Sequence, residues 1–407
     1  MKLNLFSISQ KLSIVGYILL FPIFFIYHFG LSQNYFPAFL GGLFGNVSLF
    51  VALLSFILLP WVLIYKIRYV KEPVFIFYFA IIFYLTWTFG YQYLVQNHPY
   101  GNHSFLESYS SFIIWAALFF VGFFLPVERI FFYNFLKFSC LIIFGIFGFA
   151  ILKENTFFAL FKIFQNNDES SSLSSYQQAG RSIFISFIFL ALIGHNKLFN
   201  LIILLVGAIM LLSIGSRTDL ISIFLTILLY CFHILFKGNG TLIKKALVFS
   251  TFLFLLIFTF FLTRTVFNDS RAAELFDLAS STSWQGRSDL SSNAILIIKQ
   301  YPILGKFDYY DTSGGYAHNI LSSWTSFGFF GFILYLFILI YFLIISTYGY
   351  FFKSKLSILW LLVLSLNLIS LIQALVASPI FSALPALGWG LTLNVFLRSK
   401  FDILSRN

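Results

Sequence analysis

Two short stretches, each containing an arginine, are candidate sites of chemistry in a largely apolar chain. Residues 215–219 (GSRTD) separate two apolar runs, and residues 284–287 (WQGR) precede a helix-like stretch at 288–300. The planar guanidinium fork of arginine is suited to phosphate groups. A cation at a helix N-terminus is disfavoured by the helix dipole, so a bound anion would explain Arg287. Arg217 and Arg287 are therefore candidate ligands of a phosphorylated group.

A turn-rich loop and a histidine follow the second arginine. Residues 301–305 (YPILG) carry the proline and glycine typical of turns, and Asp308 and Asp311 come next. His318 and Asn319 then stand at the start of another apolar run. Histidine titrates near neutral pH and is the usual general base, so His318 is the candidate for proton abstraction.

Each of these groups also has a structural interpretation. Arg217 could pair with Asp219 or lie in the membrane interface, and Arg287 could be a solvated charge at a helix end. His318 could cap the helix that follows it. Two spaced aspartates without further ligands do not define a metal site, and solvated loop acids have the same pattern.

The composition dictates the elements that must position these residues. Of the 407 residues, 60% are hydrophobic, 22% aromatic and 10% charged, whereas a soluble domain has about 25% charged residues. The sequence thus predicts an all-α, polytopic integral membrane protein and excludes a secreted enzyme or a disordered chain. Long apolar runs predict about twelve transmembrane helices, at 12–30, 43–65, 73–95, 109–125, 130–152, 181–195, 199–215, 218–236, 246–265, 318–349, 356–377 and 384–398.

The distribution of charge predicts the orientation. With the N-terminus in the cytoplasm, the inner connections carry sixteen basic and three acidic residues, and the outer ones nine and eleven. This excess of cations on one side follows the positive-inside rule. Both termini are therefore expected in the cytoplasm, and the net charge of +11 reports topology and gives no indication of nucleic-acid binding. The long loop at 266–317 is then periplasmic, and its helix at 288–300 is expected to lie on the membrane face.

In this order, the polar groups resemble the O-antigen ligase and O-antigen polymerase superfamily of bacterial membrane glycosyltransferases. The resemblance covers about residues 199–350 and rests on Ser216-Arg217, Gly286-Arg287, Pro302-Ile303-Leu304-Gly305, His318-Asn319, Gly328 and Gly331. It divides the chain into N-terminal helices at 1–198, a core at 199–350 and C-terminal helices at 351–407. In one respect the chain departs from the ligase branch, which more often has small or apolar residues where Thr218-Asp219 stand.

The resemblance implies a GT-C-like fold and the transfer of a glycan from undecaprenyl pyrophosphate on the periplasmic face of the bacterial inner membrane. The site residues it implies are His318 as the catalytic base, Arg217, Arg287 and Arg181 for the pyrophosphate, and Asn319, Asp308 and Trp284 for the substrate. No metal or cofactor is expected, because the leaving group is a lipid pyrophosphate. A chain-length regulator and a flippase are the expected protein partners, and membrane lipid surrounds the chain.

The sequence leaves three functions open. An O-antigen polymerase would join lipid-linked repeat units to one another, and an O-antigen ligase would transfer the glycan to lipid A core. A transporter or flippase of lipid-linked oligosaccharides would instead have ionisable residues within the spans and paired helix interruptions. The spans carry almost no charge, which argues against the transporter. The ordered motifs and the departure from the ligase pattern make the polymerase the first hypothesis.

Overall fold

The computed structural model describes residues 5–36, 73–95, 102–165, 176–194, 196–237, 250, 282–307, 317, 319–353, 357–376 and 380–404, and these contain helices but no strand. Helix formation is the expected result for apolar runs of this length, because lipid offers the backbone no hydrogen-bond partners. Seven segments among the described residues are long and apolar enough to cross a membrane: Ser7–Ser32, Ile130–Glu154, Tyr176–Ile193, Lys197–Ile214, Arg217–Lys237, Leu321–Phe352 and Ser357–Val376.

Several such segments in one chain indicate a polytopic, all-helical membrane protein. Two of the predicted spans, 43–65 and 246–265, lie outside the described residues apart from Ser250. Every other predicted span coincides with a helix. The fold class is therefore confirmed, whereas the total of twelve spans and the GT-C-like arrangement remain predictions.

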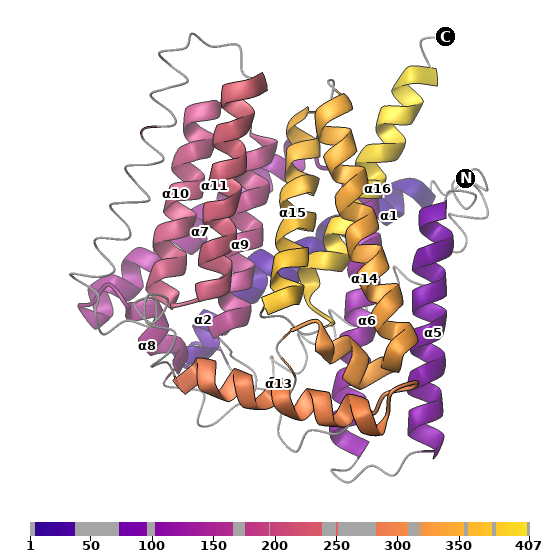
Figure 1. Cartoon of the computed structure of the whole chain (residues 1–407). Helices are drawn as coiled ribbons and strands as arrows, with labels where there is room; N and C mark the ends of the chain where they lie inside the picture. The colour runs from indigo at the N-terminus through magenta and orange to yellow at the C-terminus, as the bar shows by residue number, and fades with distance from the viewer. Residues whose placement is uncertain are drawn as a thin grey trace. The chain divides into compact units, whose positions relative to one another are not determined.

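The chain divides into two compact units, which are described one at a time. Unit 1 comprises residues 1–16, 46–125 and 282–407. Its helices beyond the start of α1 are α5 (Pro73–Val95), α6 (Asn102–Phe124), α13 (Thr282–Gln300), α14 (Leu321–Phe352), α15 (Ser357–Val376) and α16 (Ala383–Leu404). Within this unit, α13 runs across the end of α14, and α5 lies beside α14 (Figure 1).

The core of unit 1 is the close packing of α6 against α16. A Cβ atom built on Gly390 would lie 1.8 Å from the carbonyl oxygen of Phe119, so the two backbones approach too closely for any larger residue. Small residues at such crossings are typical of membrane helices. Asn394 adds a polar link, since its buried amide donates to the carbonyl oxygens of Gly122 (3.4 Å) and Leu125 (2.9 Å).

Unit 2 comprises residues 17–45 and 126–281. The N-terminal helix α1 (Leu5–Ile18) continues into it through a π-helical turn, η1 (Leu19–Ile23), which contains Pro22. The other helices are α2 (Phe24–Ser32), α7 (Ile130–Glu154), α8 (Ala159–Gln165), α9 (Tyr176–Ile193), α10 (Lys197–Ile214) and α11 (Arg217–Lys237).

Helix α9 is the centre of unit 2. Every residue from Ser182 to Ile193 is buried, and the helix contacts η1, α2, α7, α8, α10 and α11. From Ser182 onward the polar residues of α9 are Ser182 and Ser186 alone, and a helix that is apolar on nearly all sides is expected in such a central position. Arg181 lies one residue before this buried stretch, where α9 still reaches partly exposed surroundings.

Candidate functional site

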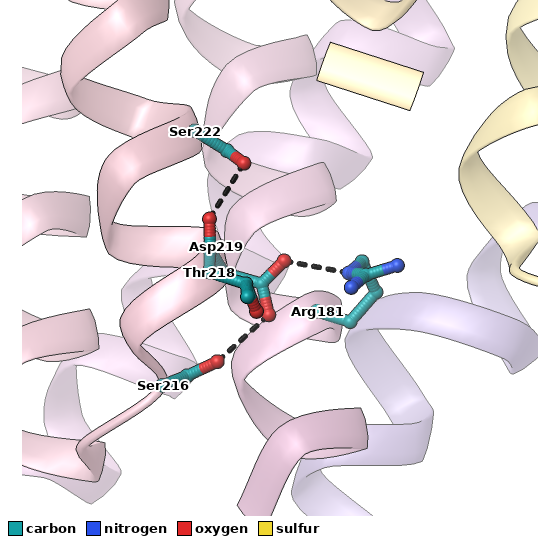
Figure 2. A network of polar contacts seen from close by, with 5 residues as sticks. All are labelled: Arg181, Ser216, Thr218, Asp219 and Ser222. Atoms are coloured by element: carbon teal, nitrogen blue, oxygen red, sulfur yellow. Dashed lines mark hydrogen bonds and ion pairs between the residues drawn. The ribbon is translucent and has the colours of Figure 1, made fainter. Parts of the chain in front are cut away.

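A buried carboxylate, Asp219, organises the first polar group of unit 2. Its side chain is 0% exposed, and its Oδ1 atom lies 2.6 Å from Nε of Arg181, whose side chain is 18% exposed. Ser216 Oγ donates to the other oxygen, Oδ2, at 2.8 Å. Figure 2 shows Arg181 of α9 pointing toward Asp219 of α11, with Ser216 below it. We refer to Arg181, Ser216 and Asp219 as the ion-pair cluster.

The local sequence explains why these three side chains meet. Gly215 ends α10 with a left-handed φ of +73°, a conformation that glycine adopts at little cost. Ser216 then precedes α11 and Asp219 stands in its first turn, which is the spacing of a helix-capping pair. An acidic group in a first turn is also favoured by the helix dipole.

Glycine at position 180 allows α9 to approach this turn. A Cβ atom there would lie 2.5 Å from Cβ of Ser216 and 2.7 Å from its Oγ. The close approach brings Arg181, the next residue, within reach of Asp219. The Asp219 carboxylate requires a positively charged partner, because a buried carboxylate without one strongly destabilises the folded protein.

Arg217 belongs to the same junction. It is the first residue of α11, it directly follows Ser216, and it is half-buried. The ion pair joins the second turn of α9, which begins at Tyr176, to the first turn of α11. The structure thus brings Arg181 and Arg217, two of the three predicted pyrophosphate ligands, to one junction of α9, α10 and α11.

The other predicted ligands belong to unit 1. Arg287 and Trp284 lie in α13, which begins at Thr282. The prediction that Gly286-Arg287 stand before this helix is therefore wrong: they lie within its second turn. Thr282 and Ser283 are residue types that favour helix starts, and Gly286 is exposed with no atom near its missing Cβ, so the helix tolerates it.

Asn319 links α13 to the start of α14. Its Nδ2 donates to Ser291 Oγ of α13 at 3.2 Å, and its Oδ1 accepts from the Leu321 amide at 2.9 Å. Ser291 Oγ also donates to the carbonyl oxygen of Ala317 at 3.5 Å. The predicted base His318 and the predicted substrate ligand Asp308 lie outside the described residues.

The turn at 302–305 fills a break in α14. At Gly328 the helix has a φ of +69° and a ψ of −172°, a combination essentially restricted to glycine. Backbone bonds from the turn replace the helical ones: Phe329 N donates to Pro302 O (2.9 Å), and Lys306 N donates to Thr325 O (2.7 Å). Trp324 Nε1 also donates to Pro302 O, at 3.0 Å.

Helix α5 supplies the remaining partners of this break. Tyr84 Oη donates to Phe327 O at 2.8 Å. Gln92 donates through Nε2 to Leu304 O (2.9 Å) and Ser326 O (2.8 Å), and its Oε1 accepts from Phe307 N at 3.0 Å. We refer to Tyr84, Gln92, residues 302–307 and residues 324–329 as the helix-break cluster.

Sequence reasoning missed Gln92 and the partner of Asp219. A lone glutamine inside the predicted span 73–95 was the available signal, because a polar side chain within a transmembrane helix is usually bonded to protein. For Asp219, the structure gives Arg181 as an ion-pair partner. Among the residues that the structure describes, no three His, Cys, Asp or Glu side chains are grouped so as to hold a metal ion.

The predicted site residues therefore fall into two groups. Arg181 and Arg217 belong to unit 2, whereas Trp284, Arg287 and Asn319 belong to unit 1. No protein-family model matches the chain, and no curated protein is significantly similar to it in sequence.

Proposed function

We propose that the protein is an O-antigen polymerase. It would join oligosaccharide repeat units, linked through pyrophosphate to undecaprenol, on the periplasmic face of the bacterial inner membrane. Both termini would then lie in the cytoplasm, in agreement with the positive-inside distribution of basic residues.

The observation that carries the proposal is the ion-pair cluster. It joins Arg181 of α9 to the first turn of α11, the helix that begins at Arg217. Two arginines at a junction that includes the N-terminus of α11 make a favourable environment for a doubly phosphorylated group. The neutralising partner, Asp219, is fully buried, so the partly exposed Arg181 is the member of the pair that reaches the surroundings.

The chemistry requires a base and a stabilised leaving group. His318 would accept the proton of the acceptor hydroxyl, whose oxygen then bonds to the anomeric carbon of the donor glycan. The bond from that carbon to the pyrophosphate oxygen breaks, and undecaprenyl pyrophosphate leaves with the electron pair. Arg181, Arg217 and Arg287 would stabilise the charge that develops on the departing pyrophosphate.

A lipopolysaccharide gel tests the proposal. Cells that lack the protein should make core carrying one repeat unit, and the parent gene should restore the long-chain ladder. Arg217→Ala, Arg287→Ala and His318→Ala should each reduce polymer by about 100-fold or more. Lys299→Ala, an exposed change in the same helix as Arg287, should leave the ladder intact.

Each outcome on the gel has one meaning. A full ladder in cells without the protein would overturn the proposed function. A full ladder from one alanine variant, with protein present at the parent amount, would remove the role assigned to that residue.

The same motifs also fit an O-antigen ligase, and the gel separates the two enzymes. Loss of a ligase leaves bare core, because no glycan reaches lipid A, whereas loss of a polymerase leaves one repeat unit on the core. The polar residues Thr218 and Asp219 favour the polymerase, and the pairing of Asp219 with Arg181 gives that departure from the ligase pattern a structural purpose.

One observation favours a transporter of lipid-linked oligosaccharides instead. Helix α14 is interrupted at Gly328, and interrupted helices frequently form transporter binding sites. In this chain, however, the turn at 302–307 already occupies the hydrogen-bonding groups of the break. The interruption therefore serves to hold a loop, which agrees better with an enzyme whose site lies on that loop.

A further inference from the structure

A group of lysines lies in unit 2 at the opposite end of α11 from the ion-pair cluster. Lys137 Nζ of α7 lies 5.9 Å from the ring centroid of Phe199, near the start of α10. Tyr230 Oη of α11 donates to Lys197 O, at the first residue of α10, at 3.2 Å. Helix α11 lies beside α10 (Figure 1) and ends at Lys237. We refer to Lys137, Lys197 and Lys237 as the lysine patch.

Two members of the lysine patch lie close to one histidine. Lys197 is the first residue of α10, and Lys237 is the last residue of α11. The charges of both act on His233, whose side chain is buried. Lys197 is exposed and Lys237 is half-buried, so positive charge reaches the surface where these two helices meet.

Lys137 is the member of the patch that does not stand at a helix end. Helix α7 has 25 residues and is roughly 38 Å long, whereas the hydrocarbon core of a bilayer is about 30 Å thick. Lys137 lies about two turns into this helix and is half-buried. Its Nζ atom is 4.6 Å from the ring centroid of Tyr133 and 5.9 Å from that of Phe199. The two rings favour a cation at this place, and the long side chain can extend its ammonium group toward the lipid headgroups.

The sequence around the lysine patch supplies few carboxylates. Residues 130–140, 196–202 and 230–237 contain the three lysines but no Asp or Glu. Glu128 precedes α7 and is followed directly by Arg129, so these two charges offset each other. The ion-pair cluster, by contrast, contains its own buried carboxylate. An excess of positive charge at a membrane surface attracts anionic headgroups.

Exposed apolar side chains flank the lysine patch on two helices. Phe138 and Leu141 of α7 are 62% and 67% exposed, and Leu198 and Ile202 of α10 are 68% and 47% exposed. In a bilayer, apolar side chains of this kind contact the acyl chains of lipids. A phospholipid at this place would thus have its phosphate near the ammonium groups and its acyl chains on apolar surface.

We propose that the lysine patch binds the headgroup of an anionic phospholipid. The lipid phosphate accepts charge-assisted hydrogen bonds from the ammonium groups, and the acyl chains lie along the exposed apolar side chains of α7 and α10. In the orientation predicted from the sequence, this end of unit 2 faces the cytoplasm, and the lipid belongs to the inner leaflet. The inference does not depend on the polymerase, because binding is expected whether or not the protein transfers a glycan.

Native mass spectrometry of the full-length protein in detergent measures this binding. The protein is titrated with dioleoylphosphatidylglycerol, which is anionic, and with dioleoylphosphatidylcholine, which is zwitterionic and has the same acyl chains. The parent protein should bind the first phosphatidylglycerol at least about tenfold more tightly, because only that lipid has a net charge to pair with the lysines. Equal affinities for the two lipids would overturn the proposal.

Variants then locate the site. Lys137→Gln should weaken the binding of phosphatidylglycerol about fivefold, the contribution expected of one lysine near a membrane surface, and should leave the binding of phosphatidylcholine unchanged. Lys137→Arg keeps the charge and should bind like the parent. Lys162→Gln is the matched control, because it removes an exposed lysine of α8, near the opposite end of α10 (Figure 1). Both of its affinities should equal those of the parent.

Equal binding of phosphatidylglycerol by the parent and by a folded Lys137→Gln protein would overturn the proposal. Circular dichroism of both proteins shows whether they have the same helix content. If Lys137→Gln does not fold, Lys197→Gln replaces it, because Lys197 is exposed at the start of α10. The same fivefold loss is expected, and binding at the parent level would overturn the proposal equally.

The last arm distinguishes a lipid from a soluble phosphate compound. The probe is sn-glycerol 1-phosphate, which carries the phosphate without acyl chains. It should bind at least about 100-fold more weakly than phosphatidylglycerol, because it buries no apolar chain. An affinity equal to that of the lipid would overturn the assignment of a lipid to this surface.

Discussion

Both polar clusters provide partners for polar groups among apolar helices, but they use different interactions. In the ion-pair cluster of unit 2, three side chains bring a charge pair out of contact with most of the solvent. In the helix-break cluster of unit 1, neutral side chains and a loop satisfy backbone groups that an interrupted helix leaves open. Both lie where apolar helices meet polar segments.

This difference determines how substitutions in each cluster alter the free energy of unfolding. A buried ion pair is destabilised mainly when one partner is removed, because the other charge is left behind. The hydrogen bonds between uncharged groups at the helix break are lost mainly when the backbone conformation changes, because the geometry of the break decides which of them form. Stability measurements on the full-length protein in detergent can therefore distinguish the two.

The largest effect is expected at the glycine of the helix break. Gly328→Ala should lower the free energy of unfolding by about 4 kcal/mol or more, because the residue has a backbone conformation essentially limited to glycine. An added Cβ would also lie 1.9 Å from the carbonyl oxygen of Ile303. Equilibrium unfolding in mixed detergent micelles measures the change.

Gly90→Ala is the control for this substitution. Gly90 lies in α5 of the same unit and has no atom within 4 Å of its missing Cβ. The control should alter stability by less than about 1 kcal/mol, in the stabilising direction expected of alanine in a helix. Similar unfolding curves for the two variants would show that the break at Gly328 is absent.

A smaller and asymmetric effect is expected in the ion-pair cluster. Arg181→Met removes the charge partner of a carboxylate that is 0% exposed and should destabilise by about 3 kcal/mol. Asp219→Asn leaves Arg181, which is 18% exposed, in contact with water and should cost about half as much. Unfolding of both variants and of the double variant measures the asymmetry.

The exposed Arg129→Met serves as the control for removing an arginine and should change stability by less than about 0.5 kcal/mol. A greater loss for Asp219→Asn than for Arg181→Met would contradict the account, since it would mean that the arginine is the more deeply buried charge.

The sequence alone predicts the helices of both units far better than it predicts these contacts. Apolar runs of about 20 residues identify membrane helices. Every predicted span within the described residues coincides with helical structure, and seven of those segments are long and apolar enough to cross a membrane. The turn at 301–305 was also predictable, because proline and glycine mark it. These features depend on local chemistry.

The contacts between distant segments depend on packing, which a single sequence does not record. Gln92 and Leu304 are 212 positions apart, and nothing in an isolated glutamine specifies its partner. Asp219 has an arginine two positions away and another 38 positions away, and the close approach at Gly180 brings the distant one to it. The start of α13 was misplaced for a related reason: Gly286 suggests a helix boundary, but an exposed glycine that meets no neighbour is tolerated.

The smallest difference expected compares one hydroxyl from each cluster. Ser216→Ala removes the bond to the Asp219 carboxylate and should cost about 2 kcal/mol, since hydrogen bonds to charged groups are the stronger kind. Tyr84→Phe removes the bond to the neutral carbonyl of Phe327 and should cost about 1 kcal/mol. Thr347→Val, whose hydroxyl bonds only to Leu343 O of its own helix among the contacts described, should be nearly neutral. Unfolding of the three variants under the same conditions measures the order of these stability losses. A larger loss of unfolding free energy for Tyr84→Phe than for Ser216→Ala would contradict this order. It would mean that a bond to the backbone at the helix break stabilises the protein more than a bond to the buried carboxylate.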